Sequence, residues 1–301
     1  MMRKLKIAGV ALLVLILAAA AFVFYLHRRA LPQIAGAIAT AGVSAKVEII
    51  RDPWGVPHIF AENERDGFYG LGWATAQDRL FQIAMFNQAV QGRLAEWFGE
   101  PVVQFDKIFR TLDFQGVGKR LYASSSRESR RAVDAYQQGV NDYAAMIDSS
   151  LPIEFAILRK SFEPLKPGDL VGMLGFLAFA LHDAWRFEPI YARLVEKVGA
   201  PLAEQLFPYA RGGSPAVYDT AQAPRPRLFE LSAEERSLLP FLPRFDASNN
   251  WAVAPHKSAT GHALLANDPH LGHAHPPIWY QAHLKAGALD VTGVTIPGLP
   301  G

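Results

Sequence analysis

The chain has 301 residues, of which 50% are hydrophobic and 19% charged, so it can bury a substantial core and is neither disordered nor strongly acidic. The net charge of +2, without a basic and aromatic stripe, gives no sign of nucleic-acid binding. The absence of cysteine excludes disulfides, thiolate metal sites and a cysteine nucleophile.

Residues 1–30 are set apart by an uncharged apolar run from Ile7 to Leu26, with basic residues on both sides. In a helix, a run of about twenty residues rises about 30 Å, which is the thickness of a bilayer core. This length favours an uncleaved signal anchor, a membrane helix, over a cleaved signal peptide, whose apolar region is shorter. Under either interpretation the rest of the chain is exported.

The region 45–200 is predicted to be mainly helical. Two short strands, Val47–Ile50 and His58–Phe60, flank a turn rich in proline and glycine. Apolar residues at helical spacing then predict three helices: Asp66–Phe98, Glu128–Ile147, and one from Asp169 through Ala184.

The composition changes twice in the remaining chain. Region 201–247 is rich in proline and is predicted to be a spacer or linker, because proline removes backbone donors that helices and strands need. Region 248–301 is rich in strand signals, so the fold class is α+β. The predicted strands are Trp251–Ala254, Ala263–Ala266, Ile278–Leu284 and Leu289–Thr295. A sheet that begins this late predicts that the sequence is a truncated piece of a longer protein.

Two familiar kinds of chemical site find little support in the sequence. The spacing His270-x-x-His273-x-His275 matches no familiar zinc pattern, which favours loop histidines over a zinc site. No serine lies in G-x-S-x-G or begins S-x-x-K, so the usual serine-hydrolase signals are absent.

Ser248, at the end of the proline-rich region, supports a different hypothesis. If the bond before Ser248 were cut, this residue would carry both a hydroxyl and a free α-amine. The pKa of an α-amine lies well below that of a lysine amine, so the amine can act as a general base near neutral pH. Nucleophile and base would then reside in one residue.

Several motifs occur in an order that resembles the penicillin acylase family of N-terminal-nucleophile hydrolases, and most closely its cephalosporin and quorum-quenching acylases. The similarity extends over about residues 45–301. The motifs are Asp52-Pro53-Trp54-Gly55-Val56-Pro57-His58-Ile59, Ala76-Gln77-Asp78-Arg79-Leu80-Phe81-Gln82, Gly92-Arg93-Leu94-Ala95-Glu96, Ser248-Asn249-Asn250-Trp251 and Asn267-Asp268-Pro269-His270.

The resemblance implies an αββα sandwich, incomplete in this sequence, and a precursor that cuts itself between Ala247 and Ser248. The products would be an α-chain and a β-chain that stay together as a heterodimer in the periplasm, with the spacer removed. Relatives commonly have glycine where Ala247 stands, and a Cβ restricts the strained backbone needed for cleavage.

The resemblance also assigns roles to individual residues. Ser248 is the nucleophile, and His270 orients its amine and hydroxyl or relays a proton. Leu271 and Tyr280 lie near the acyl-binding pocket, and Glu188 is a candidate ligand for a structural calcium ion. No organic cofactor is implied. The oxyanion-hole residues would follow Gly301, so the fragment alone is expected to be inactive.

The predicted function is that of a self-processing amidohydrolase acting on linear amides of the penicillin or cephalosporin type. Glutaryl-accepting relatives have arginine where Leu271 stands, and leucine cannot pair with a carboxylate, so the acyl group is expected to be apolar. Two alternatives remain open: an N-acyl-homoserine lactone acylase, or a membrane-anchored protein that keeps the fold without catalysis.

Overall fold

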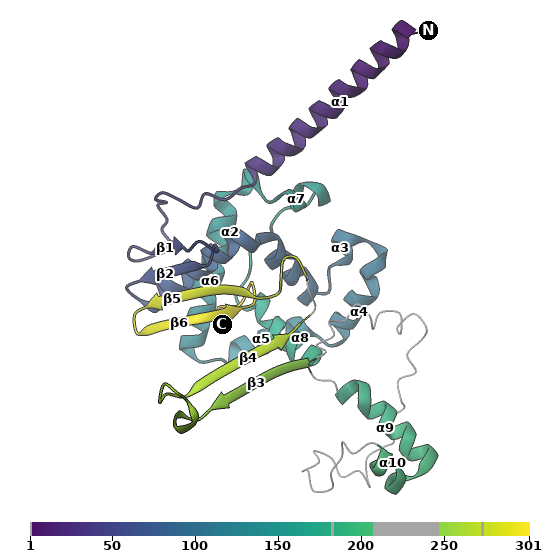
Figure 1. Cartoon of the computed structure of the whole chain (residues 1–301), viewed down its shortest axis with the longest axis vertical. Helices are drawn as coiled ribbons and strands as arrows, with labels where there is room; N and C mark the ends of the chain where they lie inside the picture. The colour runs from purple at the N-terminus through teal and green to yellow at the C-terminus, as the bar shows by residue number, and fades with distance from the viewer. Residues whose placement is uncertain (1, 182–183, 207–246, 272–273) are drawn as a thin grey trace. The chain divides into compact units, whose positions relative to one another are not determined.

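The computed structural model describes residues 2–181, 184–206, 247–271 and 274–301 (Figure 1). The chain folds into two compact units. The first unit comprises Met1–Gly175 and His273–Gly301, and the second comprises Phe176–Gly272.

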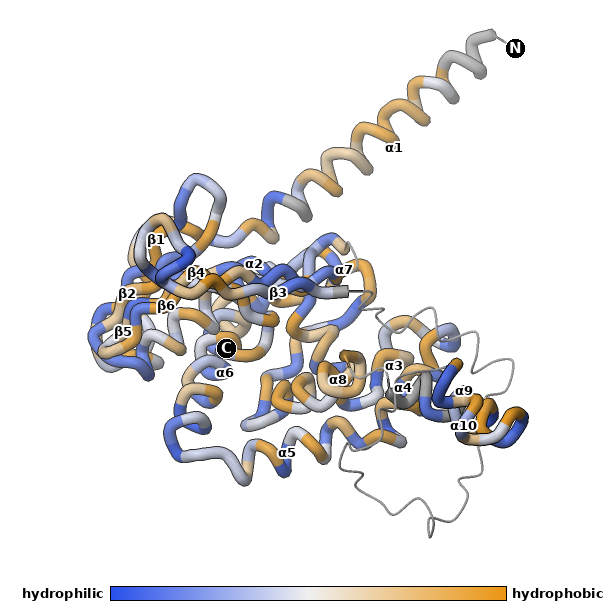
Figure 2. The backbone as a smooth tube through the Cα atoms, turned by 60° about the horizontal axis from the view of Figure 1, so that its bottom comes forward, coloured by the Kyte–Doolittle hydropathy of each residue, from blue (hydrophilic) through white to orange (hydrophobic). Residues whose placement is uncertain are grey.

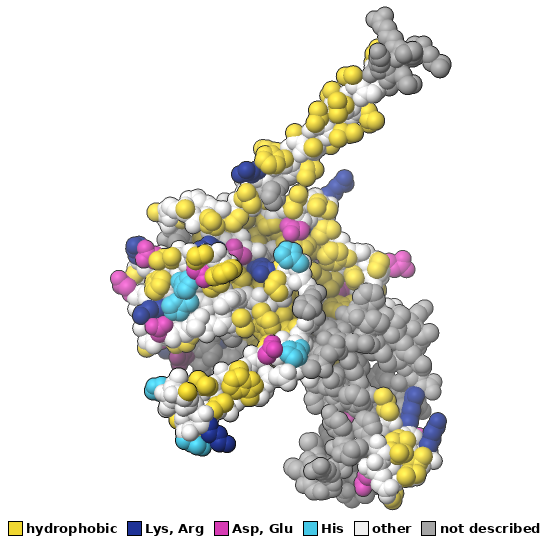
Figure 3. Space-filling view, viewed as in Figure 1, with side chains coloured by type: hydrophobic (Ala, Val, Ile, Leu, Met, Phe, Trp, Pro, Cys, Tyr) yellow, Lys and Arg dark blue, Asp and Glu magenta, His cyan; other side chains and the backbone are white. Residues whose placement is uncertain are grey.

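Helix α1 (Met2–Arg29) is one continuous helix. Most of its length is coloured as hydrophobic in Figure 2. Its apolar side chains are exposed, as the space-filling view shows (Figure 3). Within the part of the chain that the structure describes, no helix combines the length and the hydropathy needed to cross a bilayer. The predicted signal anchor is therefore not supported.

A four-stranded sheet forms the centre of the first unit, in the order β1-β2-β5-β6 (Figure 1). β1 (Glu48–Arg51) and β2 (Pro57–Ala61) are antiparallel, and β2 runs parallel to β5 (Tyr280–Ala286). β6 (Leu289–Thr295) returns antiparallel to β5, with the predicted bounds. The sheet thus joins segments that lie on opposite sides of Ser248 in the sequence.

Helix α2 (Glu64–Val90) packs on one face of this sheet, where Ile59, Leu284 and Ala286 are buried. The predicted helix to Phe98 is wrong at its end, because α2 stops before Gly92. Gly92 has φ +61°, its N–H donates to Ala89 O, and the next N–H donates to Gln88 O. This pair of bonds is the Schellman motif that ends helices.

The other helices of the first unit cluster around α2. The predicted helix from Asp169 begins as a 3₁₀ turn, Asp169–Val171, and continues as α8, which is described as far as Leu181. Residues 182 and 183, next to the predicted end at Ala184, lie outside the described residues. The bounds are α3 Ala95–Phe98, α4 Val103–Thr111, α5 Phe114–Ser124, α6 Arg127–Met146, α7 Ile153–Leu158 and α8 Gly172–Leu181.

Helices α2 and α6 cross at two glycines, Gly72 and Gly139. A Cβ on Gly72 would overlap the carbonyl oxygen of Tyr136, and a Cβ on Gly139 would overlap that of Tyr69. Both overlapped atoms are backbone carbonyl oxygens, so an added Cβ fits only if the two helices move apart.

Gly72→Ala is therefore expected to lower the free energy of unfolding by about 2–3 kcal/mol. Gly9 is the matched control, because it is a helical glycine with no atom within 4 Å of an added Cβ. Urea unfolding of both variants measures the difference. Equal stability of Gly72→Ala and Gly9→Ala would contradict the close helix contact.

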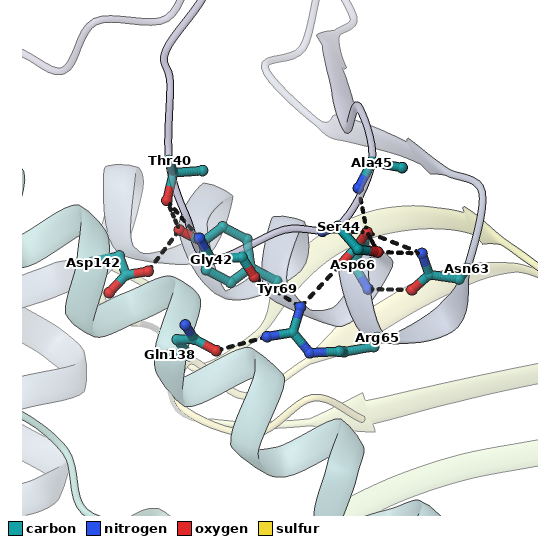
Figure 4. A network of polar contacts seen from close by, with 10 residues as sticks. All are labelled: Thr40, Gly42, Ser44, Ala45, Asn63, Arg65, Asp66, Tyr69, Gln138 and Asp142. Atoms are coloured by element: carbon teal, nitrogen blue, oxygen red, sulfur yellow. Dashed lines mark hydrogen bonds and ion pairs between the residues drawn. The ribbon is translucent and has the colours of Figure 1, made fainter.

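A buried carboxylate, Asp66, attaches the segment before β1 to α2 (Figure 4). Asp66 is 0% exposed, and its Oδ2 accepts from the Ser44 N–H at 2.9 Å, the Ser44 hydroxyl at 2.6 Å and the Ala45 N–H at 3.0 Å. Asn63, the N-cap of α2, adds an amide donor at 2.9 Å. Burial by itself raises the pKa of Asp66, but these hydrogen bonds outweigh it and lower the pKa to about 2.

The second unit contains α9 (Ala184–Val198), α10 (Ala200–Leu206) and a two-stranded sheet of β3 (Ala247–Val253) and β4 (Leu264–His270). Most of the predicted spacer, residues 207–246, lies outside the described residues. The described residues contain both helices and β-sheets, so the fold is α+β as predicted. The complete αββα sandwich stays a prediction.

Candidate active site

The candidate nucleophile lies at the start of the β3–β4 hairpin. The antiparallel register pairs Ser248 with Pro269 and Ala247 with His270. In the connection between the strands, the Ser258 hydroxyl lies 2.8 Å from the Thr260 hydroxyl and accepts from the Thr260 N–H at 3.2 Å. The register brings the Ala247–Ser248 bond opposite the end of β4.

The Ser248 side chain is exposed. Side chains alternate between the faces of a sheet, and directly paired residues share a face. Ser248 therefore lies on the face of Pro269, whereas the side chain of His270 points to the other face. In this uncut chain the hairpin brings the backbone of His270 to the predicted cleavage point but does not bring its imidazole to the Ser248 hydroxyl.

Asp268 is a residue of this site that the sequence analysis left without a role. Its Oδ2 lies 2.9 Å from His270 Nε2, and the two side chains are 75% and 43% exposed. Residues two apart on a strand share a face, but the predicted strand Ala263–Ala266 stops before Asp268, so only the observed extension of β4 to His270 brings this pair together. The carboxylate accepts from His270 Nε2 when that nitrogen carries the proton, and so favours this tautomer.

Two other predicted residues lie elsewhere in the second unit. Leu271 follows β4 directly and is half-buried, whereas Glu188 lies in α9 and is exposed. His273, from the zinc hypothesis, lies outside the described residues.

The predicted calcium site depends on oxygen ligands around Glu188. Across the described ranges, no group of three or more His, Asp or Glu side chains is arranged to hold a metal ion. Calcium takes about six to eight oxygen ligands, and the described neighbours of Glu188 do not supply that number. Calcium binding stays a prediction.

Tyr280 belongs to the first unit, where it is 5% exposed. Its hydroxyl lies 2.6 Å from Asp78 Oδ2 and 3.0 Å from Ala74 O, both on α2. Asp78 also accepts from Arg51 Nη1 at 2.7 Å. Burial, followed by the charge of Asp78, raises the pKa of Tyr280. The hydroxyl thus links β5 to α2, and its predicted place near an acyl pocket stays untested.

Tyr280→Phe is expected to reduce the free energy of unfolding by about 1–3 kcal/mol, because Asp78 loses a buried donor. Tyr122→Phe is the matched control, since the Tyr122 hydroxyl donates to an exposed carboxylate, Asp134, at 2.6 Å. Its expected effect is below about 1 kcal/mol. Denaturant unfolding compares the two, and equal losses would contradict the buried link.

The first unit also contains a largely apolar cavity of about 640 Å³ between α2, α5, α6 and the strands β5 and β6. Its lining includes Leu71, Leu174, Leu284 and Val291. Tyr280, which belongs to the same unit, does not line it.

Comparison with known proteins matches this chain to proteins named as acylases. The chain is 34% identical over 288 residues to "Penicillin acylase 2 proenzyme" of Pseudomonas sp. (strain SE83), covering 90% of this chain and 36% of that protein. It is 31% identical over 282 residues to "Acyl-homoserine lactone acylase QuiP" of Pseudomonas aeruginosa, covering 90% of this chain and 33% of that protein. The chain thus spans about a third of the length of these relatives.

A solved structure, the thermostable penicillin G acylase from Alcaligenes faecalis, is 28% identical, with a TM-score of 0.47, and the match covers 60% of this chain and 98% of that one. The sequence family described as penicillin amidase matches residues 46–301. Because this match covers most of the chain and the motifs predicted it, the chain belongs to the penicillin amidase family.

Proposed function

We propose that the full-length protein is a self-processing acylase that hydrolyses a linear amide with an apolar acyl group, such as the side-chain amide of a penicillin or cephalosporin. The observation that carries this proposal is the family match over residues 46–301 together with an exposed serine, Ser248, at the start of a strand. One relative is named a proenzyme, which supports activation by cleavage.

The proposed activation cuts the bond between Ala247 and Ser248. The Ser248 hydroxyl attacks the Ala247 carbonyl carbon, the acyl group moves from nitrogen to oxygen, and water hydrolyses the ester. This sequence leaves a carboxylate on Ala247 and a free amine on Ser248. This proposal is supported by the pairing of Ala247 with His270, whose imidazole contacts Asp268 in the uncut chain.

In turnover, the Ser248 oxygen attacks the substrate carbonyl while the α-amine accepts the hydroxyl proton. The amine then gives this proton to the leaving amine, and water releases the acyl group from the ester. His270 is the proposed positioning residue for the α-amine. Leu271 offers no charge to an acyl carboxylate, which supports an apolar acyl group.

The two products of cleavage would remain one assembly. β2 precedes the cut and β5 follows it, yet the two strands pair in parallel over four residue pairs. The Tyr280–Asp78 hydrogen bond joins the same two segments. We therefore propose an α/β heterodimer. The apolar run with a basic flank at the N-terminus supports export.

N-acyl-homoserine lactone hydrolysis is the second candidate, and the 31% identity to the QuiP acylase favours it.

Intact mass analysis of the full-length protein is expected to show two chains, the second beginning at Ser248. Hydrolysis rates of long-chain acyl-homoserine lactones, phenylacetyl amides and glutaryl amides then separate the substrates. An active single chain would contradict the mechanism, and a cut protein that prefers glutaryl amides would contradict the apolar acyl assignment. An inactive single chain would favour the non-catalytic alternative.

A further inference from the structure

We propose that His58 and His283 form a binding site for a transition-metal ion such as Zn²⁺ or Cu²⁺, separate from the proposed hydrolytic site. His58 lies on β2 and His283 on β5, and the parallel register pairs the two residues directly. Their side chains share the face of the sheet opposite α2, since the alternate residues Ile59 and Leu284 are buried against that helix. Figure 3 shows histidine side chains at the surface over this sheet, beside acidic ones.

The inner nitrogens of the two rings face each other. His58 Nδ1 lies 3.1 Å from His283 Nδ1. With metal–nitrogen bonds of about 2.0–2.1 Å, this separation corresponds to an angle of about 95–100° at a shared ion. Such an angle lies between the octahedral and tetrahedral values, so the separation of the two nitrogens suits one shared ion.

The outer nitrogens of both rings face carboxylates. His283 Nε2 lies 2.9 Å from Asp290 Oδ1, and His58 Nε2 lies 3.8 Å from Asp52 Oδ2. At His283 the carboxylate lies within hydrogen-bond distance, which favours a proton on Nε2 and leaves the Nδ1 lone pair free, as in many metal-bound histidines. The two Nδ1 atoms form a hydrogen bond when one ring carries its proton on Nδ1, and when both rings carry theirs on Nε2 the two lone pairs can bind one cation. A metal ion or a single shared proton can fill this position.

The surroundings favour an ion with solvent ligands. The side chains of His58 and His283 are 35% and 20% exposed, which leaves one side of the pair open to water. Within the described residues no third metal-ligating side chain joins the pair. Imidazole nitrogen suits zinc, copper and nickel, whereas calcium and magnesium prefer oxygen, so the site is distinct from any calcium site. Phe60, edge-to-face with His283 at 5.8 Å, and Lys285, 3.1 Å from Asp290 Oδ2, complete the surroundings.

A bound ion would connect two distant parts of the sequence, because the paired histidines are 225 residues apart. β2 precedes Ser248 and β5 follows it, so the ion would hold the two strands together whether or not the chain is cut. Binding to the folded state alone would raise the melting temperature in a concentration-dependent way.

Calorimetric titration of ZnCl₂ into the full-length protein at neutral pH tests the proposal. We expect one equivalent of zinc that the double variant His58→Gln/His283→Gln does not bind, and about tenfold weaker binding in Asp290→Asn. His262→Gln, an exposed histidine in the turn between β3 and β4, is the matched control and is expected to bind normally. The same zinc stoichiometry and affinity in the double variant, or no zinc binding by the wild type, would overturn the site.

A second measurement remains decisive if the double variant does not fold. Electron paramagnetic resonance of the wild type with one equivalent of CuCl₂ is expected to show hyperfine coupling to two imidazole nitrogens. Coupling to one nitrogen or to none would overturn the two-histidine site and leave the shared proton. Neither measurement depends on hydrolytic activity, so failure of the metal site and failure of the proposed function are distinguishable.

Discussion

Ser248→Ala in the full-length protein is expected to leave one uncut chain and to abolish amide hydrolysis. The substitution removes the only hydroxyl at the proposed cut, so neither the Ala247 carbonyl nor a substrate carbonyl meets the nucleophile. Loss of a nucleophile of this kind costs a factor of about 10⁴–10⁶ in kcat. Intact mass and the release of the leaving amine measure the two losses separately.

Two variants serve as controls for this result. Ser258→Ala changes a serine in the turn of the same hairpin, whose hydroxyl bonds to Thr260, and is expected to be cut normally. Ser248→Cys keeps a nucleophile at the site and is expected to be cut, in contrast to alanine. Cleavage before residue 248 in Ser248→Ala would show that a different group performs the cut.

Asp66→Asn is expected to lower the free energy of unfolding by about 2–4 kcal/mol. In the native protein, donors of Ser44, Ala45 and Asn63 converge on one buried oxygen of Asp66. An asparagine amide keeps the shape of the side chain but removes the charge and one acceptor, so at least one buried donor loses its partner. Thermal or urea unfolding of the full-length protein measures the loss.

The same carboxylate predicts an acid dependence of stability. The folded-state pKa of Asp66, about 2, lies below the ordinary value of 3.8, so the ionised form favours the folded state. Asp66 therefore contributes its stability above pH 3.8, and the contribution is lost as pH falls toward 2. The shift corresponds to about 2 kcal/mol. Asp66→Asn should remove this part of the pH dependence.

Glu48→Gln is the matched control for both measurements on Asp66. The Glu48 side chain is 54% exposed, and its Oε1 lies 3.7 Å from Lys46 Nζ. Loss of this exposed ion pair is expected to change the free energy of unfolding by less than about 1 kcal/mol. If Asp66→Asn and Glu48→Gln behaved alike in stability and in acid sensitivity, the buried network would not hold the N-terminal segment.

The elements that local patterns predicted well are those with strong periodicity. The strand signals of residues 289–295 predicted β6 at its observed bounds, and the apolar stripe on α6 predicted that helix within one residue at each end. Boundaries failed where one backbone position decided the outcome, as at Gly92, where a positive φ ends α2. The serine candidate came from motif order rather than from any local conformation.

The sequence by itself determined the family, the candidate nucleophile Ser248 and the α+β class, because these depend on residue types in a fixed order. Only the tertiary structure decided that β5 pairs in parallel with β2, that Tyr280 binds Asp78, and that His58 faces His283. It also decided that the Asp268–His270 pair lies on the opposite face from Ser248. Such contacts depend on strand register and on packing between segments far apart in the chain, which no local pattern of residues encodes.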